Sequence, residues 1–372
     1  ENEPKAQRLD LVRRYYNEFA DKLMSAPTPN YVNLGTRLRG FASCCLYVTD
    51  DNEQSLAIGD HIAYRMTAAS AGIGSHYITR SKADPVRGGL IEHQGKLPYF
   101  ASLGKAVNAN MQAGRGGACT TYYSGFDPEA EVISYLRNPR STEDRKNRDL
   151  HYALVTNRLF AEKVAKNEDA FSFNVFTAPK LAKLFFSSDA DGFKQEYERL
   201  EQDPSFKKNY FNPRDLILTS LNEALETGVA YLANIDEMNR HTPFIEPIHS
   251  SNLCLEICEP NRPYQDMRDL YSDKEVGYIT VATTDGAQQR FNFNEPLALD
   301  NGRVIFAGHL KVGDVLLSRD QAAFSPVAQI IDTYAEPEVA LCSLGAIACD
   351  RIAEDDDVAY QEAMYLTLKM ID

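Results

Sequence analysis

Residues 251–257 have the sequence SNLCLEI, which places an amide, a thiol and a carboxyl group at alternate positions. In an extended loop, the side chains of Asn252, Cys254 and Glu256 would all point to the same side. A carboxylate held beside a thiol can accept a proton from a substrate bound there. The stretch therefore predicts a reactive loop centred on Cys254.

The cysteine pattern favours thiol chemistry over a metal site. Seven cysteines occur, at positions 44, 45, 119, 254, 258, 342 and 349. An odd number without a secretory signal predicts a reducing compartment, and we expect a cytoplasmic protein. Neither a CxxC pair nor an HxxxH or HExxH spacing is present, so no metal is expected on this chain.

Charge and hydropathy exclude two classes of partner. The 372 residues carry a formal net charge of −14, whereas binding to a nucleic-acid polymer needs clustered Lys and Arg. A membrane-spanning helix needs about 18 consecutive apolar residues, and the sequence has no such run. We therefore expect neither a nucleic-acid polymer nor a membrane as the partner, although a single nucleotide remains compatible.

Apolar spacing predicts an α/β architecture. Short apolar or alternating runs at 44–48, 151–156 and 229–235 are typical of strands, and helical spacing at 9–23 and a helix from Asn212-Pro213 onward lie between or beside them. A helix at 58–66 is expected to close at a turn formed by residues 71–74 (AGIG).

Residues 276–335 differ from this pattern and predict a β-rich insertion. Apolar positions on either side of Asp285-Gly286 indicate a hairpin that runs from Ile279 to Phe293, and Asn301-Gly302 offers a second turn. We therefore divide the chain into residues 1–275, the insertion at 276–335 and residues 336–372.

The SNLCLEI stretch resembles the active-site loop of the large subunit of class I ribonucleotide reductases. Further segments resemble that family in the same order along the chain, over about residues 7–258 and 338–370. They lie at 27–29, 43–44, 71–74, 87–89, 115–118 and 341–344. The resemblance implies part of a ten-stranded α/β barrel with an active-site finger loop. The first half of the barrel would lie in 1–275 and the second half would begin in 336–372. The pattern ends before that half is complete, which suggests a cut piece or a split enzyme of a phage type.

The resemblance also implies roles for the cysteines. Cys254 would become a thiyl radical that abstracts the 3′ hydrogen of a ribonucleoside diphosphate. Glu256 would be the general base, and Asn252 would bind the substrate hydroxyls. Reduction needs two electrons and two protons, which a dithiol supplies when it becomes a disulfide. Cys44 and Cys342 resemble this pair, Cys45 is the alternative to Cys44, and Cys119, Cys258 and Cys349 are expected to be structural.

Substrate, effector and partner sites follow from the same resemblance. Thr28, Ser43, Ala71 and Gly72 match positions that line the substrate site. A dNTP or ATP effector would be sensed by Asp51, Arg80, Arg115, Gly116 and Gly117. The expected partners are a C-terminal half of the large subunit, a metal-containing small subunit that supplies the radical, and thioredoxin or glutaredoxin.

Two other functions fit parts of the pattern. A nucleotide-binding regulatory fragment could keep the fold without turnover, although it would not need the three cysteines together with Asn252 and Glu256. A cobalamin-dependent relative is disfavoured because its active-site loop has a different sequence.

Overall fold

The computed structural model describes most of the chain. The described residues are 5–33, 36–37, 42–110, 116–142, 146–267, 277–292, 295–317, 325–334, 339–342, 344, 346–348, 351–352 and 356–371.

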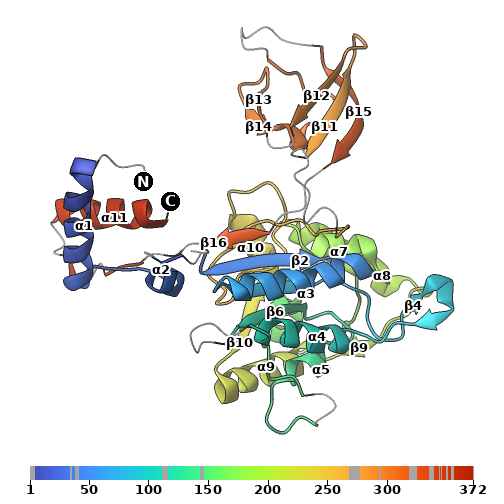
Figure 1. Cartoon of the computed structure of the whole chain (residues 1–372). Coiled ribbons are helices and arrows are strands. Elements are labelled where there is room, and N and C mark those ends of the chain that lie inside the picture. The colour runs from blue at the N-terminus through green and yellow to red at the C-terminus, as the bar shows by residue number, and fades with distance from the viewer. Residues whose placement is uncertain are drawn as a thin grey trace.

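The main body is built on a six-stranded sheet with the order β10-β7-β6-β3-β2-β16 (Figure 1). Five of these strands run parallel, and β16 is antiparallel to β2. The strands are β2 (Cys44–Thr49), β3 (Gly72–Tyr77), β6 (Cys119–Ser124), β7 (His151–Thr156), β10 (Ala230–Asn234) and β16 (Ala340–Cys342). The expected α/β architecture is confirmed.

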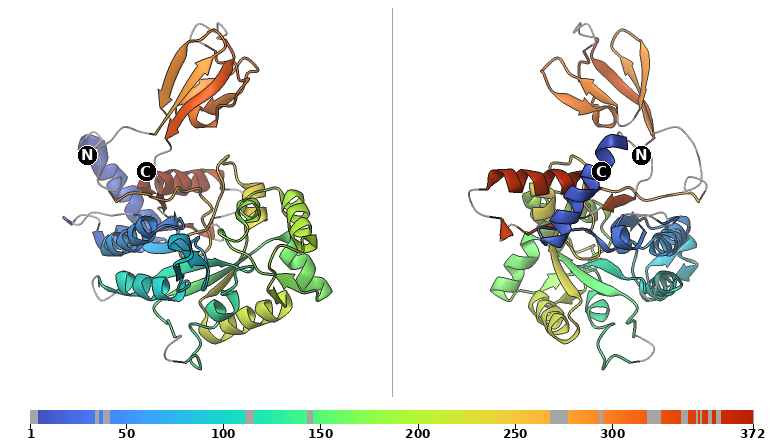
Figure 2. Two further views of the ribbon diagram at one scale, coloured as in Figure 1. Left: turned by 90° about the vertical axis from the view of Figure 1, so that its right-hand side faces the viewer. Right: turned by 60° about the vertical axis from the view of Figure 1, so that its left-hand side comes forward.

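Helices cover one face of this sheet (Figures 1 and 2). α3 (Glu53–Ala68) contacts β2 and β3, α5 (Ala130–Ser134) contacts β6 and β7, and α9 (Pro213–Thr227) contacts β10. Side chains at the helix starts satisfy free backbone N–H groups: Asn52 accepts from Ser55 N, and Asn212 accepts from Arg214 N and Asp215 N. Apolar side chains between the two layers form the main hydrophobic core.

The remaining elements connect or flank these layers. The helices are α1 (Lys5–Ala20), α2 (Thr28–Asn33), α4 (Leu97–Asn108), α6 (Arg158–Lys166), α7 (Pro179–Phe185), α8 (Ala190–Gln202), α10 (Ile235–His241) and α11 (Asp357–Ile371), with short 3-10 turns η1 (Arg87–Gly89) and η3 (Ala307–His309). Two-residue strands pair as β1 (Met24–Ser25) with β17 (Ala346–Ile347), β4 (Pro85–Val86) with β5 (Ile91–Glu92), and β8 (Ala170–Phe171) with β9 (Tyr210–Phe211).

The first and last helices lie side by side, although they are far apart in the sequence (Figure 2). The Arg14 guanidinium binds both carboxylate oxygens of Glu362, at 2.5 and 2.7 Å, and Tyr15 OH donates to Leu366 O at 3.1 Å. The hydrogen bond from Arg14 lowers the pKa of Glu362. α1 and α11 are therefore joined by polar contacts.

The β-rich insertion has a hydrophobic core of its own. β11 (Tyr278–Thr283) pairs with β12 (Gln288–Asn292) and β15 (Val327–Tyr334), and β13 (Pro296–Ala298) pairs with β14 (Val304–Phe306). Gly286 and Gly302 have φ of +86° and +81°, which the hairpin turns require. Phe293 lies outside the described residues. The separate core consists of Ile279, Val281, Leu299, Ile305, Ala307, Leu310, Leu316 and Val327.

The segment at residues 71–74 differs from the sequence-based expectation. Residues 71–74 were expected to form a turn, but Gly72 and Gly74 belong to β3. A Cβ on Gly74 would lie 2.0 Å from Ser251 O, so this glycine allows another backbone to approach the strand. Glycine in β3 therefore reflects close contact with residues 251–257, not a turn.

Candidate active site

The finger loop, residues 249–258, lies against the face of the sheet that α3 does not cover. Thr120 Oγ1 donates to Leu253 O at 2.6 Å, and Tyr122 OH donates to Asn252 O at 2.6 Å. At its base, His249 O lies 2.7 Å from Nδ1 of His76. Three neighbouring positions of β3 and β6 thus hold the loop through hydrogen bonds to its backbone.

The centre of the loop is a turn, so the expectation of an extended segment is wrong. Asn252 Oδ1 accepts hydrogen bonds from Glu256 N (3.1 Å) and Ile257 N (3.2 Å), and Asn252 Nδ2 donates to Glu256 Oε1 (2.7 Å). Leu255 has φ of +67°, a conformation that is costly for a side chain of this size. The short polar side chain of Asn252 stabilises this turn, as Asn commonly does in loops.

Three of the five expected catalytic residues, Cys254, Glu256 and Cys44, line one pocket of about 420 Å³, whereas Asn252 and Cys342 are not among its lining residues. Cys254 and Glu256 line it from the finger loop, and Cys44 lines it from the first position of β2. Thr28 and Ser43, which were expected to contact the substrate, line the same pocket. Its other lining residues are Ser25, Ala26, Pro27, Pro29, Ser70, Leu253, Leu344 and Ala346.

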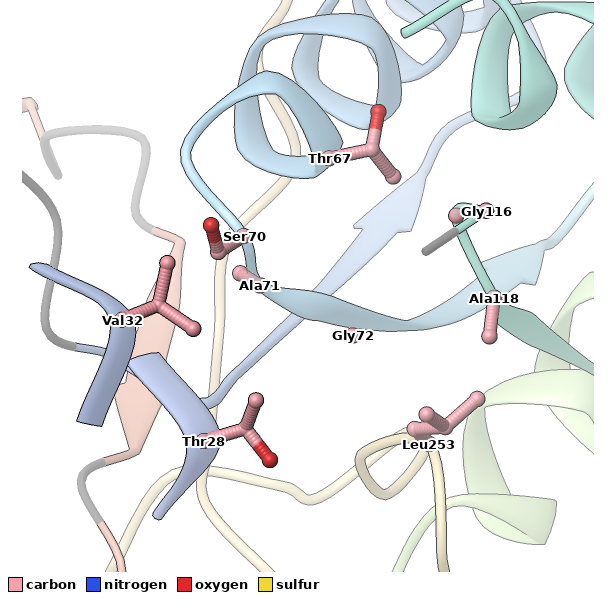
Figure 3. A pocket seen from close by; sticks show the side chains of 10 residues that line it. Thr28, Val32, Thr67, Ser70, Ala71, Gly72, Gly116, Ala118 and Leu253 are labelled. Atoms are coloured by element: carbon pink, nitrogen blue, oxygen red, sulfur yellow. The ribbon is translucent and has the colours of Figure 1, made fainter. Parts of the chain in front are cut away.

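A second pocket of about 220 Å³ shares part of this wall (Figure 3). Thr28, Ser70 and Leu253 line both pockets. The second pocket also contains Ala71 and Gly72 from the start of β3, and Gly116, Gly117 and Ala118 from just before β6. Four expected site residues that the first pocket lacks are therefore found in its neighbour.

The expected dithiol pair is brought together by sheet register. Cys342 in β16 lies directly opposite Cys44 in β2. Opposite residues of an antiparallel pair have Cα atoms about 4.5–5.5 Å apart, within the range of about 4.4–6.8 Å that a disulfide spans. Cys45 is fully buried in the main core, and its strand neighbour Cys44 points to the other face of the sheet. Register and face both distinguish Cys44 from Cys45.

Burial controls the acidity of the paired thiols. It raises the pKa of Cys44, and the polar side chain of Asn252 offsets part of that shift. It also raises the pKa of Cys342 to about 11, with a further contribution from Cys44. Cys254 is exposed. At neutral pH the pair is therefore protonated and carries hydrogen that it can donate.

Cys119 and Cys258 are not among the residues that line the pocket. Cys119 is buried beside Ser75 Oγ at 3.4 Å, and Cys258 is half-buried against the main core. Cys349 lies outside the described residues.

The four described residues expected to sense an effector lie at opposite ends of the parallel sheet, in two pairs. Asp51 follows β2, Arg80 follows β3, and the Arg80 guanidinium binds Asp51 Oδ2 at 2.8 Å and lies over the Phe176 ring at 4.6 Å. Gly116 and Gly117 instead precede β6, at the opposite end of the parallel sheet. Six-residue strands span about 20 Å. Arg115 lies outside the described residues.

Sequence reasoning missed several residues that shape the site, chiefly Thr120 and Tyr122 on β6. That strand begins CTTYY, and β-branched and aromatic residues favour strands, so its composition could have revealed it. The hydroxyl groups of its Thr and Tyr residues make the strand look less apolar than the buried strands that were predicted. Gly72 and Gly74 leave room for Leu253 and Ser251, which approach β3 too closely for a Cβ at either position. This close approach cannot be inferred from a single sequence.

The described residues contain neither a metal-binding cluster nor a membrane-spanning helix. No group of three or more His, Cys, Asp or Glu side chains there is placed to hold a metal ion. In the same part of the chain, no helix is both long and apolar enough to cross a membrane.

Comparison with known proteins identifies the family of this chain. The family described as "Ribonucleotide reductase, barrel domain" matches residues 42–372. The ribonucleoside-diphosphate reductase subunit alpha of Haemophilus influenzae is 34% identical over 285 residues, which is 75% of this chain and 37% of that protein. The ribonucleoside-diphosphate reductase 1 subunit alpha of Escherichia coli is 33% identical over 270 residues, 71% of this chain and 35% of that protein. The alpha subunit of Enterobacteria phage T4 is 31% identical over 296 residues, 76% of this chain and 37% of that protein.

The chain spans little more than a third of the length of these relatives. The matched region nevertheless includes the whole six-stranded sheet and the finger loop. On this match, and with a thiol-lined pocket at the end of its parallel sheet, the chain belongs to the ribonucleotide reductase barrel-domain family.

Proposed function

We propose that this chain carries the catalytic thiol site of a ribonucleoside-diphosphate reductase. The observation that carries the proposal is the position of Cys44, which lines the pocket with Cys254 and Glu256 and also lies opposite Cys342. A radical-forming thiol, a carboxyl group and a potential disulfide pair thus meet at one place. A regulatory fragment that only bound nucleotides would leave this combination unexplained.

Each group has a step in the proposed reaction. A thiyl radical at Cys254 takes the 3′ hydrogen atom of the ribonucleoside diphosphate, and Glu256 accepts the 3′-hydroxyl proton. The 2′ hydroxyl leaves as water after it gains a proton. Cys44 and Cys342 supply two electrons and two protons in total and become a disulfide. Of the two dithiol hydrogens, one leaves in the water and the other is bound at C2′. Cys254 then returns its hydrogen atom to C3′, Glu256 returns its proton to the 3′ oxygen, and the thiyl radical at Cys254 is restored.

The raised pKa values of the dithiol suit this role. A thiolate could not donate a proton, whereas burial keeps both Cys44 and Cys342 protonated at neutral pH. The disulfide must be reduced before the next turnover, so the site needs a reducing compartment such as the cytoplasm and a dithiol reductant of the thioredoxin or glutaredoxin type.

Substrate and partner assignments complete the proposal. Thr28, Ser43, Ala71 and Gly72 would contact the substrate, because they line the two joined pockets. Asp51 and Arg80 would contact a dNTP or ATP effector, and Gly116-Gly117 would transmit its identity to the pocket. The radical would come from a metal-containing small subunit. Because the chain spans little more than a third of its relatives, we propose that turnover also needs the remainder of the family's barrel.

The test compares Cys254→Ser with Cys258→Ser in the reductase assembled with those parts. Serine holds its hydrogen too strongly to form the radical, so Cys254→Ser should abolish deoxynucleotide formation and leave nucleotide binding near normal. Cys258 lies four residues away and outside the pocket wall, so Cys258→Ser should keep most of the activity. Deoxynucleotide formation by Cys254→Ser would refute the proposed function.

A further inference from the structure

Two hydroxyl groups of β6 bind the two carbonyl groups that come just before Cys254. Tyr122 OH donates to Asn252 O and Thr120 Oγ1 donates to Leu253 O, both at 2.6 Å. Both side chains are buried, at 1% and 0% exposure. Successive residues of a strand alternate between faces, so these two share the face that carries the finger loop. Neither is among the residues that line the two pockets.

The loop is pressed against β3 at the same level. A Cβ on Gly72 would lie 2.6 Å from the Leu253 side chain, and a Cβ on Gly74 would lie 2.0 Å from Ser251 O. The two glycines thus allow the close approach, while the two hydroxyl groups of the next strand supply directed bonds. The turn is fixed from two adjacent strands.

The turn needs such support because it is strained. Leu255, the residue after Cys254, has φ of +67°. A backbone of this kind persists only where the surrounding structure over-determines it. Burial also raises the pKa of Tyr122, so its hydroxyl remains a donor over the physiological pH range.

We infer that Tyr122 and Thr120 are positioning residues that set the place of the Cys254 thiol in the pocket. The inference rests on the proposed function, because it concerns the geometry of hydrogen-atom transfer by Cys254. Reacting atoms must approach closely and in line, and a displacement of about 1 Å can cost about a hundredfold in rate. Loss of either hydroxyl should therefore lower kcat and leave KM nearly unchanged.

The first measurement is amide hydrogen exchange on the intact chain. Glu256 N and Ile257 N bind Asn252 Oδ1 and report on the turn directly. Tyr122→Phe and Thr120→Val, which keep the shape of each side chain, should make these two amides exchange about three- to tenfold faster, as expected for the loss of one buried hydrogen bond. Thr120→Ser keeps the hydroxyl and should restore wild-type exchange.

The matched control is Tyr123→Phe. Tyr123 is the next residue on β6, is 3% exposed and points to the helix-covered face. Tyr123→Phe removes a tyrosine hydroxyl group that does not contact the finger loop. Amide hydrogen exchange at residues 256–257 should therefore not change.

The second measurement is steady-state turnover of the assembled reductase. Tyr122→Phe and Thr120→Val should lower kcat about tenfold or more with KM within about twofold of wild type. Unchanged exchange in both variants, or faster exchange with unchanged kcat, would overturn the inference and leave the proposed function intact. Absence of turnover in the wild-type assembly would instead count against the proposed function. In that case, amide exchange at residues 256–257 would still test whether the Tyr122 and Thr120 hydroxyl groups hold the turn.

Discussion

Replacing Gly74 by Ala should lift the finger loop from the sheet. The added Cβ would lie 2.0 Å from Ser251 O, 2.7 Å from Asn252 Cα and 2.8 Å from Asn252 C. All three are backbone atoms, so no side chain can rotate to relieve the contact. Ordinary contact distances begin near 3.4 Å, so the loop must move by about 1.4 Å or the strand must bend.

The expected cost combines two effects. Overpacking of a buried site costs about 1–3 kcal/mol. A shift of this size also weakens the hydrogen bonds from Thr120 and Tyr122, each worth about 1 kcal/mol net. We therefore expect the free energy of unfolding to fall by about 2–4 kcal/mol, and the rate of Cys254 alkylation to change because its turn is displaced.

Chemical denaturation and alkylation with mass-spectrometric detection would measure both effects. Gly116→Ala is the control for stability, because among the described residues its Cβ would meet only Asn108 Oδ1, at 3.9 Å. Wild-type stability together with a wild-type alkylation rate in Gly74→Ala would show that the loop does not rest on β3 as described.

Two further predictions concern parts of the fold outside the pocket. Replacing the insertion, from Tyr278 to Tyr334, by a short linker should leave the main body folded. These two residues pair across β11 and β15, and the insertion has its own core. Aggregation of the shortened protein, seen by size-exclusion chromatography, would contradict this. The hydrogen bonds from Arg199 and Lys180 lower the pKa of Glu196 to about 2. The stability that the Glu196 charge provides is therefore present above its unfolded pKa near 4.5 and is lost as the pH falls toward 2. Glu196→Gln should therefore lower the free energy of unfolding by about 1 kcal/mol at pH 7, a small value because both partners are largely exposed. Measured by urea unfolding, this difference from wild type should shrink below pH 4. A difference that does not depend on pH would argue against the ion pairs.

The sequence alone was sufficient for the elements with clear apolar spacing. The strands at 44–48, 151–156 and 229–235 are all present, because buried parallel strands are short apolar runs. The insertion hairpin was equally readable from Asp285-Gly286. The α/β class follows from these local signals without any knowledge of contacts between distant residues.

The geometry of the site depends on contacts that local spacing does not encode. Spacing of two predicted an extended finger loop, but the Asn252 side chain bonds to the backbone and makes a turn. The opposition of Cys342 and Cys44 arises from an antiparallel pair between segments far apart in the sequence, and only the family resemblance suggested it. The separation of Asp51 and Arg80 from Gly116 and Gly117 likewise depends on strand direction, which the motifs do not contain.

The most direct test of the account is the identity of the disulfide formed after one turnover. The assembled reductase would be fully reduced, freed of external reductant, given one equivalent of ribonucleoside diphosphate, and then alkylated and mapped by mass spectrometry. The account predicts a bridge between Cys44 and Cys342, in a yield equal to the deoxynucleotide formed, and no bridge in Cys254→Ser. A bridge that contains Cys45, Cys258 or Cys349, or deoxynucleotide formation with Cys44 and Cys342 still reduced, would contradict it.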